Sequence, residues 1–160
     1  MDSSTKREGL SFAARGGWWV VGQVPLMIVA ALLPPWTGSE YPWPVRITGY
    51  ALLGGALLLG AWAASALGRA LTPYPRPLED GEFVARGPYR YVRHPIYSAV
   101  LLAAAGWALA WQSPWGLAFL PLFFAFFDLK ARREERWLEE KYPPYAAYRQ
   151  RVRKFFPGIY

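Results

Sequence analysis

The sequence predicts an all-α fold, a polytopic membrane helical bundle of about four transmembrane helices in one domain, residues 1–160. Hydrophobic residues make up 54% of the 160-residue chain, a share that a soluble domain of this size would struggle to bury. They stand in continuous blocks, which is typical of bilayer-spanning segments rather than of amphipathic helices. The basic residues gather in the segments between and after these blocks.

Four apolar blocks define the expected transmembrane spans, at residues 16–33, 47–67, 95–111 and 115–129. We expect the first block to end at Pro34–Pro35. A helix needs roughly 20 residues to cross a hydrocarbon core about 30 Å thick, so the last two blocks are short. Small residues recur at every fourth position of the second block and predict a close approach by a neighbouring helix; they are Ala56, Gly60, Ala64 and Gly68.

The distribution of charge predicts the orientation of the spans. Of the 18 Lys and Arg residues, only Arg46 lies outside three segments: the N-terminal segment with Lys6, Arg7 and Arg15, the loop after the second block, and the tail. The positive-inside rule places these segments and both termini in the cytoplasm. Tryptophans are expected at the outer interface at Trp36, Trp43, Trp111 and Trp115, and at the inner one at Trp18 and Trp19.

Composition excludes several classes of function. The chain has no cysteine, which rules out disulfides and thiolate chemistry. Its one histidine, His94, has no companions for a metal site, so no metal is expected. No ionisable residue lies in the middle of a span, which argues against ion transport. The net charge of +7 is explained by topology, so nucleic acid is not an expected partner.

Residues 80–97 form the first informative polar segment. Gly87–Pro88 marks a turn, and Pro95 is well placed as the first residue of the third helix. Tyr89, Tyr91 and Tyr97 surround this helix start, whose free N–H groups favour an anion. The alternative is a basic, aromatic belt at the membrane surface in which His94 has only a structural role.

Residues 130–157 form the second informative segment, whose first part, 130–141, is expected to continue the fourth span as a helix. Arg132 and Glu135 are three residues apart, as are Arg136 and Glu139, so each pair is expected to share a face. A solvated ion pair is the alternative, and we prefer it for the second pair. From Pro144, an apolar stripe predicts a short interfacial helix on the membrane surface; it comprises Tyr145, Tyr148, Val152 and Phe155.

An ordered set of motifs runs through both segments, at Val84, Gly87–Pro88–Tyr89, Arg93–His94–Pro95–Ile96–Tyr97, Glu134–Glu135, Leu138, Tyr145, Tyr148 and Pro157. In these motifs the sequence resembles the integral membrane methyltransferases related to isoprenylcysteine carboxyl methyltransferase and phospholipid N-methyltransferase. The resemblance covers residues 80–160. It departs from the family pattern at Ala99, where a Gly is usual, and at Tyr142–Pro143, where Phe-Gly is usual.

The resemblance implies S-adenosylmethionine as the cofactor, held in a pocket on the cytoplasmic side. The residues expected to bind the cofactor are the motif residues Val84, Tyr89, Arg93, His94, Pro95, Tyr97, Glu134 and Glu135, together with the neighbouring Glu82 and Phe83, whose side chains suit the ribose and the adenosine. Arg93 at the His94–Pro95 helix start is expected to bind the cofactor carboxylate, and Glu135 its ammonium. Glu135 or Glu82 can instead accept hydrogen bonds from the ribose. Arg132 and Glu135 are the candidate catalytic residues, with Arg132 holding an anionic acceptor.

The expected acceptor is a lipophilic or lipid-like molecule that enters from the bilayer. The sequence leaves open whether a carboxylate or an amine is methylated, and it leaves the oligomeric state open. Two other functions remain as alternatives. One is a non-catalytic membrane scaffold, and the other is an NADPH-dependent membrane reductase, although such reductases are longer than this chain.

Overall fold

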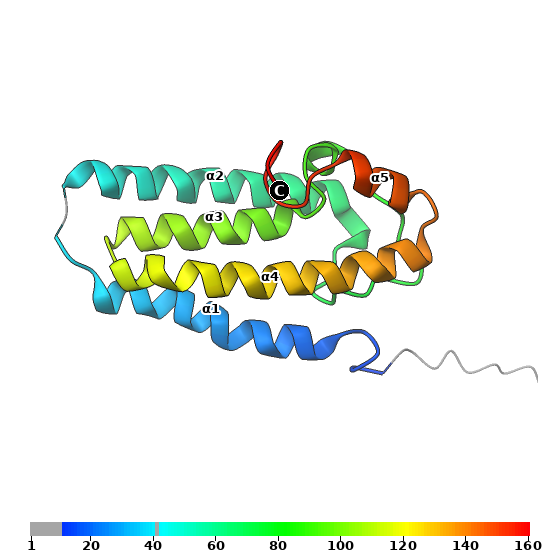
Figure 1. The fold of residues 1–160 in the computed structure, drawn as a ribbon, viewed down its shortest axis with the longest axis horizontal. Helices are drawn as coiled ribbons and strands as arrows, with labels where there is room; N and C mark the ends of the chain where they lie inside the picture. The colour runs from blue at the N-terminus through cyan, green and yellow to red at the C-terminus, as the bar shows by residue number, and fades with distance from the viewer. Residues whose placement is uncertain (1–10, 41) are drawn as a thin grey trace, which may run out of the picture.

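The computed structural model describes residues 11–40 and 42–160. Four helices lie side by side along the long axis and alternate in direction (Figure 1). The described elements are α1 (Gly17–Thr37), α2 (Trp43–Leu67), the short 3₁₀ helices η1 (Gly68–Ala70) and η2 (Gly87–Arg90), α3 (Pro95–Ala110), α4 (Pro114–Lys141) and α5 (Tyr145–Arg151). Apart from one isolated bridge between Val92 and Arg153, these residues contain no β-structure.

Three of the helices, α1, α2 and α4, are long and apolar enough to cross a membrane. The fourth, α3, is equally apolar but has 16 residues, about 24 Å at 1.5 Å per residue. Large apolar side chains point outward from the bundle, such as Leu57 and Leu58 at 74% and 73% exposure. Exposing this apolar surface to water would cost free energy, whereas exposing it to lipid does not. The chain is therefore an integral membrane protein. The predicted all-α membrane bundle is confirmed.

The helix α1 continues through Pro34 and Pro35 to Thr37, so the prediction that it ends at the two prolines is wrong. Proline cannot donate the i→i−4 hydrogen bond, which leaves the carbonyl of Ala31 without its partner from Pro35. The indole Nε1 of Trp107 on α3 donates to that carbonyl at 2.9 Å. A neighbouring helix therefore satisfies the backbone that the proline frees, as membrane helices allow.

The helices α2 and α3 approach most closely at two glycines. A Cβ atom on Gly49 would lie 2.3 Å from the backbone nitrogen of Ala110, and one on Gly106 would lie 2.8 Å from the carbonyl oxygen of Gly49. The predicted small-residue seam is right in part. Ala56 is buried, but a Cβ atom added at Gly68 would meet no neighbouring helix within 4 Å, because α2 ends at Leu67.

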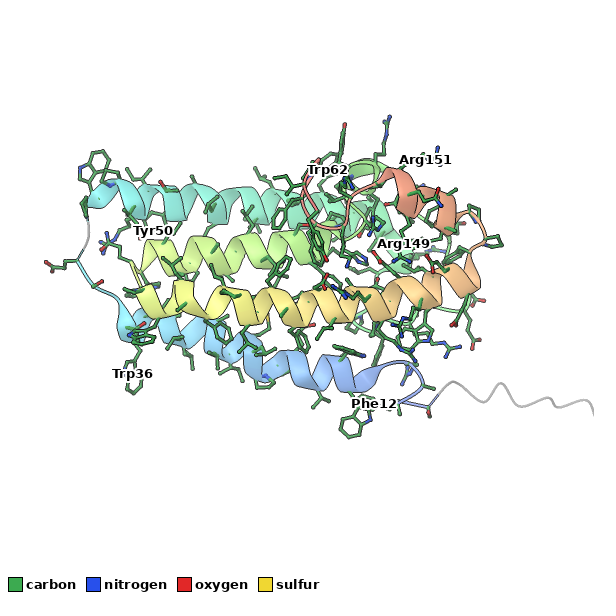
Figure 2. The ribbon with its side chains drawn as sticks, viewed as in Figure 1. Phe12, Trp36, Tyr50, Trp62, Arg149 and Arg151 are labelled. Carbon is green, nitrogen blue, oxygen red and sulfur yellow. The ribbon has the colours of Figure 1, made fainter. Side chains whose placement is uncertain are left out.

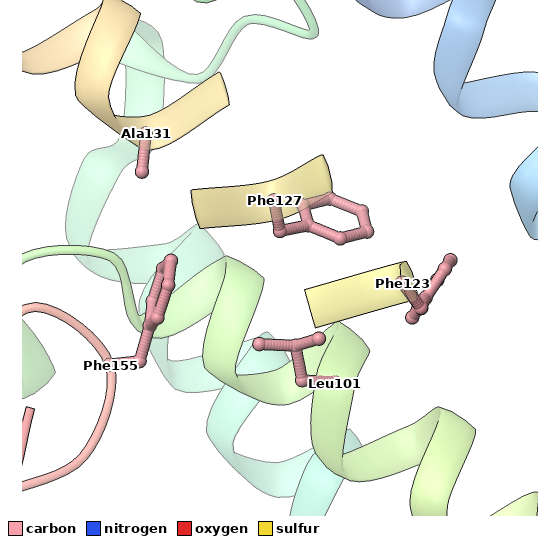
Figure 3. Close-up of a cluster of buried hydrophobic side chains, with 5 residues drawn as sticks. All are labelled: Leu101, Phe123, Phe127, Ala131 and Phe155. Carbon is pink, nitrogen blue, oxygen red and sulfur yellow. The ribbon is translucent and has the colours of Figure 1, made fainter. Parts of the chain in front are cut away.

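The core lies where α3, α4 and the C-terminal tail meet. Figure 3 shows the tail residue Phe155 beside α3 and α4, within a buried cluster formed by Leu101, Phe123, Phe127, Ala131 and Phe155. The helix α5 has only seven residues, and Tyr145 and Tyr148 are 2% and 6% exposed. The apolar stripe assigned to the membrane surface therefore packs mostly inside the protein, which corrects the prediction that this stripe faces the membrane.

The two ends of the bundle differ in the side chains they expose. The predicted interfacial tryptophans Trp36, Trp43, Trp111 and Trp115 are all exposed near the helix ends α1–α2 and α3–α4. Figure 2 shows Trp36 at this end and Arg149 and Arg151 at the other. Lys6 and Arg7 lie outside the described residues.

Candidate functional site

A cavity of about 450 Å³ lies at the end of the bundle that carries α5. Its walls come from α1, the α2–α3 connection, the start of α3, the second half of α4, and α5. Its volume is in the range of small-molecule sites. Eight of the predicted site residues line it, namely Glu82, Phe83, Val84, Tyr89, Arg93, His94, Tyr97 and Glu134.

The α2–α3 connection folds over the cavity through local turns. Gly87 begins η2 with φ at +59°, a backbone conformation that glycine adopts without steric cost. The turn places Tyr89 in the cavity wall. The Tyr148 hydroxyl of α5 donates to the Tyr89 carbonyl at 2.5 Å, which joins α5 to η2.

Aromatic rings form one wall of the cavity around Phe83. The ring centroid of Phe83 lies 5.8 Å from those of Tyr142 and Tyr145 and 5.2 Å from that of Tyr148. Burial raises the pKa of Tyr89, Tyr145 and Tyr148, because a phenolate is poorly solvated there. This wall is therefore uncharged at neutral pH.

The start of α3 is held by residues 152–155, which we call the tail strap. The strap runs parallel to residues 92–94: Arg93 N–H donates to the Arg153 carbonyl at 2.8 Å, and His94 N–H to the Lys154 carbonyl at 3.0 Å. The Ser98 hydroxyl donates to the Phe155 carbonyl at 2.7 Å. The strap, 60 residues further along the chain, thus holds the segment that brings Arg93 and His94 to the cavity.

Glu135 joins the two motif segments. Its Oε1 accepts from Arg93 Nε at 2.8 Å and lies 3.1 Å from His94 Nε2. Arg93 Nη1 also donates to the carbonyls of Arg149 and Val152. Glu135 is 1% exposed and is absent from the cavity lining. The two charges expected to bind opposite ends of a cofactor zwitterion are paired with each other instead.

Glu134, the neighbouring acid, faces the cavity. The Tyr97 hydroxyl donates to its Oε2 at 2.6 Å, and the Tyr97 ring stacks on His94 with centroids 5.3 Å apart. His94 Nδ1 lies 3.9 Å from the same carboxylate oxygen. Tyr97 therefore fixes the orientation of the one acid on α4 that reaches the cavity.

Besides Glu135, two further predicted site residues do not reach the cavity, Arg132 and Pro95. Arg132 is 57% exposed at its side chain, and its Nε donates to Asp128 Oδ2 at 2.6 Å. The expectation that Arg132 and Glu135 share a face is therefore wrong, because Asp128, one turn away, attracts the guanidinium. Pro95 is buried as the first residue of α3. The predicted Arg136–Glu139 pair is also replaced, because Glu139 binds Arg149 at 2.7 Å.

Lys130 is a cavity residue that the sequence motifs do not include. The cavity face of α4 consists of Phe127, Lys130, Glu134 and Leu138, whose spacing of three or four residues keeps them on one side of a helix. Lys130 is 3% exposed, and its Nζ donates to Gln23 Oε1 on α1 at 2.6 Å. Counting back one turn from Glu134 would have identified it.

The fold and the cavity define an integral membrane protein with a cavity of small-molecule size at one end of its helical bundle. A family model described as phospholipid methyltransferase matches residues 45–144, from the start of α2 to the end of α4. The chain belongs to the phospholipid methyltransferase family. This confirms the resemblance predicted from the motifs in residues 80–160.

The chain is also similar to the cobalt-zinc-cadmium resistance protein CzcN of Cupriavidus metallidurans. The two are 35% identical over 82 residues, which cover 51% of this chain and 38% of that relative. The match therefore spans well under half of the curated relative's length.

Proposed function

We propose that the protein is an S-adenosylmethionine-dependent methyltransferase that acts on a lipophilic acceptor at the cytoplasmic face of the membrane. One observation carries the proposal: the motif residues of a methyltransferase family gather around a single cavity, where apolar helices pass into a basic segment. The 17 basic residues in the N-terminal segment, the loop between the second and third apolar blocks and the tail support a cytoplasmic location for the cavity and for both termini.

The lining of the cavity suits the proposed cofactor. Phe83 and the tyrosines around it offer apolar faces for an adenine ring, and Glu82 and Glu134 offer acceptors for hydroxyl or ammonium groups. The Tyr145 hydroxyl is buried and has no hydrogen-bond partner in residues 11–40 and 42–160. A buried polar group of this kind normally has a partner, and a ligand in the cavity can supply it.

S-adenosylmethionine, when bound, supplies an electrophilic methyl group on a sulfonium. The protein's own contribution is to align the reactants and exclude water, which can provide much of the rate enhancement. Tyr97 holds Glu134 in place, and Glu135 holds Arg93 and His94. The aromatic wall can stabilise a cation by about 0.5–2 kcal/mol.

The acceptor is proposed to be lipophilic because apolar side chains of three membrane helices line part of the cavity. Val20 of α1, Ile96 and Val100 of α3, and Phe127 of α4 line it there. Each methylene that stays out of water contributes about 0.8 kcal/mol. In a series of acceptors that share one reactive group, turnover at low concentration is therefore expected to rise with chain length.

Transfer of a labelled methyl group tests the proposal. Membranes containing the protein are incubated with methyl-labelled S-adenosylmethionine and a total lipid extract, and the organic phase is counted. We expect label in the organic phase with the wild type and much less with Glu134→Gln. Glu140→Gln, an exposed acid on the same helix, serves as the control. Label that never leaves the aqueous phase would refute the proposal.

A further inference from the structure

The cavity contains a buried cation, Lys130, that contacts no carboxylate directly in the part of the chain that the structure describes. Among the described residues, Arg93 and Lys130 are the Lys and Arg side chains that line it. Arg93 is paired with Glu135. Lys130 has no carboxylate within 4 Å in residues 11–40 and 42–160. Its Nζ contacts Gln23 Oε1 and lies 5.3 Å from the centroid of the Tyr97 ring.

This position is unusual for a lysine at the end of a membrane span. Such side chains normally extend their ammonium group into the interfacial water. Lys130 is instead 3% exposed, with its ammonium between two residues that also line the cavity. Glu134, one turn further along α4, accepts from Tyr97 and forms no ion pair with Lys130. Ionisable groups inside a membrane bundle usually have partners or functions.

The hydrogen-bond donors of Lys130 and Gln23 that remain without a partner among the described residues suit the oxygens of a carboxylate. Lys130 uses one of the three donors on its ammonium for Gln23, and Gln23 uses its amide oxygen to accept it. The Gln23 amide nitrogen and the remaining lysine protons are therefore available to a ligand. We infer that Lys130 and Gln23 form a carboxylate-binding subsite of the cavity.

This inference rests on the proposed function, in which two molecules can bring a carboxylate: an acidic lipophilic acceptor and the methionine end of the cofactor. If the acceptor brings it, the reaction is an O-methylation. A carboxylate oxygen then forms the new C–O bond to the methyl carbon as the C–S bond breaks. Sulfur keeps the electron pair, and no proton moves.

Direct binding measurements test the subsite without turnover. The purified full-length protein in detergent micelles is titrated with dodecanoate, with dodecanol and with S-adenosylmethionine, at a mildly alkaline pH where the fatty acid is ionised. The variants are Lys130→Met, Lys130→Arg and Gln23→Leu. Arg136→Met removes the same charge from an exposed position on α4 and is the control. Thermal unfolding verifies that each variant is folded. If Lys130→Met does not fold, Gln23→Leu still tests the subsite.

If Lys130 and Gln23 bind a carboxylate, Lys130→Met should weaken the binding of at least one carboxylate ligand by about tenfold or more, because a charge-assisted hydrogen bond is lost. Lys130→Arg and Arg136→Met should have little effect. A loss confined to dodecanoate assigns the subsite to the acceptor, and a loss confined to S-adenosylmethionine assigns it to the cofactor. Unchanged affinity for both ligands in Lys130→Met and Gln23→Leu would overturn the inference. A wild type that prefers dodecanoate to dodecanol but never binds S-adenosylmethionine would keep the subsite and refute the proposed function.

Discussion

Arg93 Nε lies 2.8 Å from Glu135 Oε1, and the two side chains are 9% and 1% exposed. This pair joins the residue before His94, the N-cap of α3, to the second half of α4, 42 positions along the chain. His94 Nε2 lies 3.1 Å from the same oxygen. The Arg-His motif and the Glu-Glu motif are therefore parts of one buried polar cluster beside the cavity.

Glu135→Ala is expected to destabilise the protein. Removing one partner of a buried ion pair typically costs about 3–5 kcal/mol, because the other charge stays buried and unpaired. Thermal unfolding in detergent should therefore show a clear drop in Tm. Glu135→Gln keeps an acceptor for Arg93, so its Tm should lie between those of Glu135→Ala and the wild type. Glu140→Ala, on the exposed face of α4, should leave Tm unchanged; equal Tm values for Glu135→Ala and wild type would contradict the pairing.

Tyr97→Phe is expected to weaken cofactor binding without unfolding the protein. The substitution removes the hydroxyl that donates to Glu134 at 2.6 Å and leaves the ring stacked on His94. A hydrogen bond to a charged group contributes about 1.5–3 kcal/mol, part of which should appear as lower affinity in calorimetric titrations. Tyr91→Phe is the matched control, because Tyr91 is 58% exposed. Equal effects of the two substitutions would show that Tyr97 does not position Glu134.

Gly49→Ala is expected to force α2 and α3 apart. The new Cβ would lie 2.3 Å from the backbone nitrogen of Ala110, and overpacking of this kind costs about 1–3 kcal/mol. Gly54, on the same helix, has no atom within 4 Å of its Cβ position. Gly54→Ala should therefore be neutral or stabilising, since alanine is the better helix former. The Tm values of the two variants in detergent test this difference, and a reversed order would refute the close packing.

Cysteines introduced into this cysteine-free chain test its orientation. Gln150 and Glu40 are both exposed, one in α5 and the other in the α1–α2 connection. In sealed cells, an impermeant thiol reagent should label Glu40→Cys and spare Gln150→Cys, which should react only after the cells are opened. Labelling of Gln150→Cys in sealed cells would invert the proposed topology.

The sequence predicted the helices from local patterns, and it predicted eight residues of the cavity lining largely through its resemblance to membrane methyltransferases. The apolar blocks marked the bundle, and the continuous helical propensity after residue 129 predicted the long α4 helix. The helix start at His94–Pro95 followed from the fixed geometry of proline. The motif order then assembled residues such as Val84, Tyr89 and Glu134, which do line one cavity.

The features that the sequence could not predict depend on which of several possible tertiary contacts a side chain makes. Spacing alone allowed Arg132 to share a face with Glu135, but Asp128 binds Arg132 on the outer side of α4. An apolar stripe fits a membrane surface as well as a protein core, and Phe155 is buried in the core at 1% exposure. The continuation of α1 past its prolines likewise depends on an indole supplied by another helix.

Binding of S-adenosylmethionine to the cavity is the central claim, and two adjacent residues allow a sharp test of it. Val84 lines the cavity, whereas Ala85 is exposed and is absent from the lining. Calorimetric titration should detect binding to the wild type and to Ala85→Trp, and no binding to a folded Val84→Trp, whose added indole occupies the cavity. Equal affinity in all three proteins, or no binding to the wild type, would contradict the account.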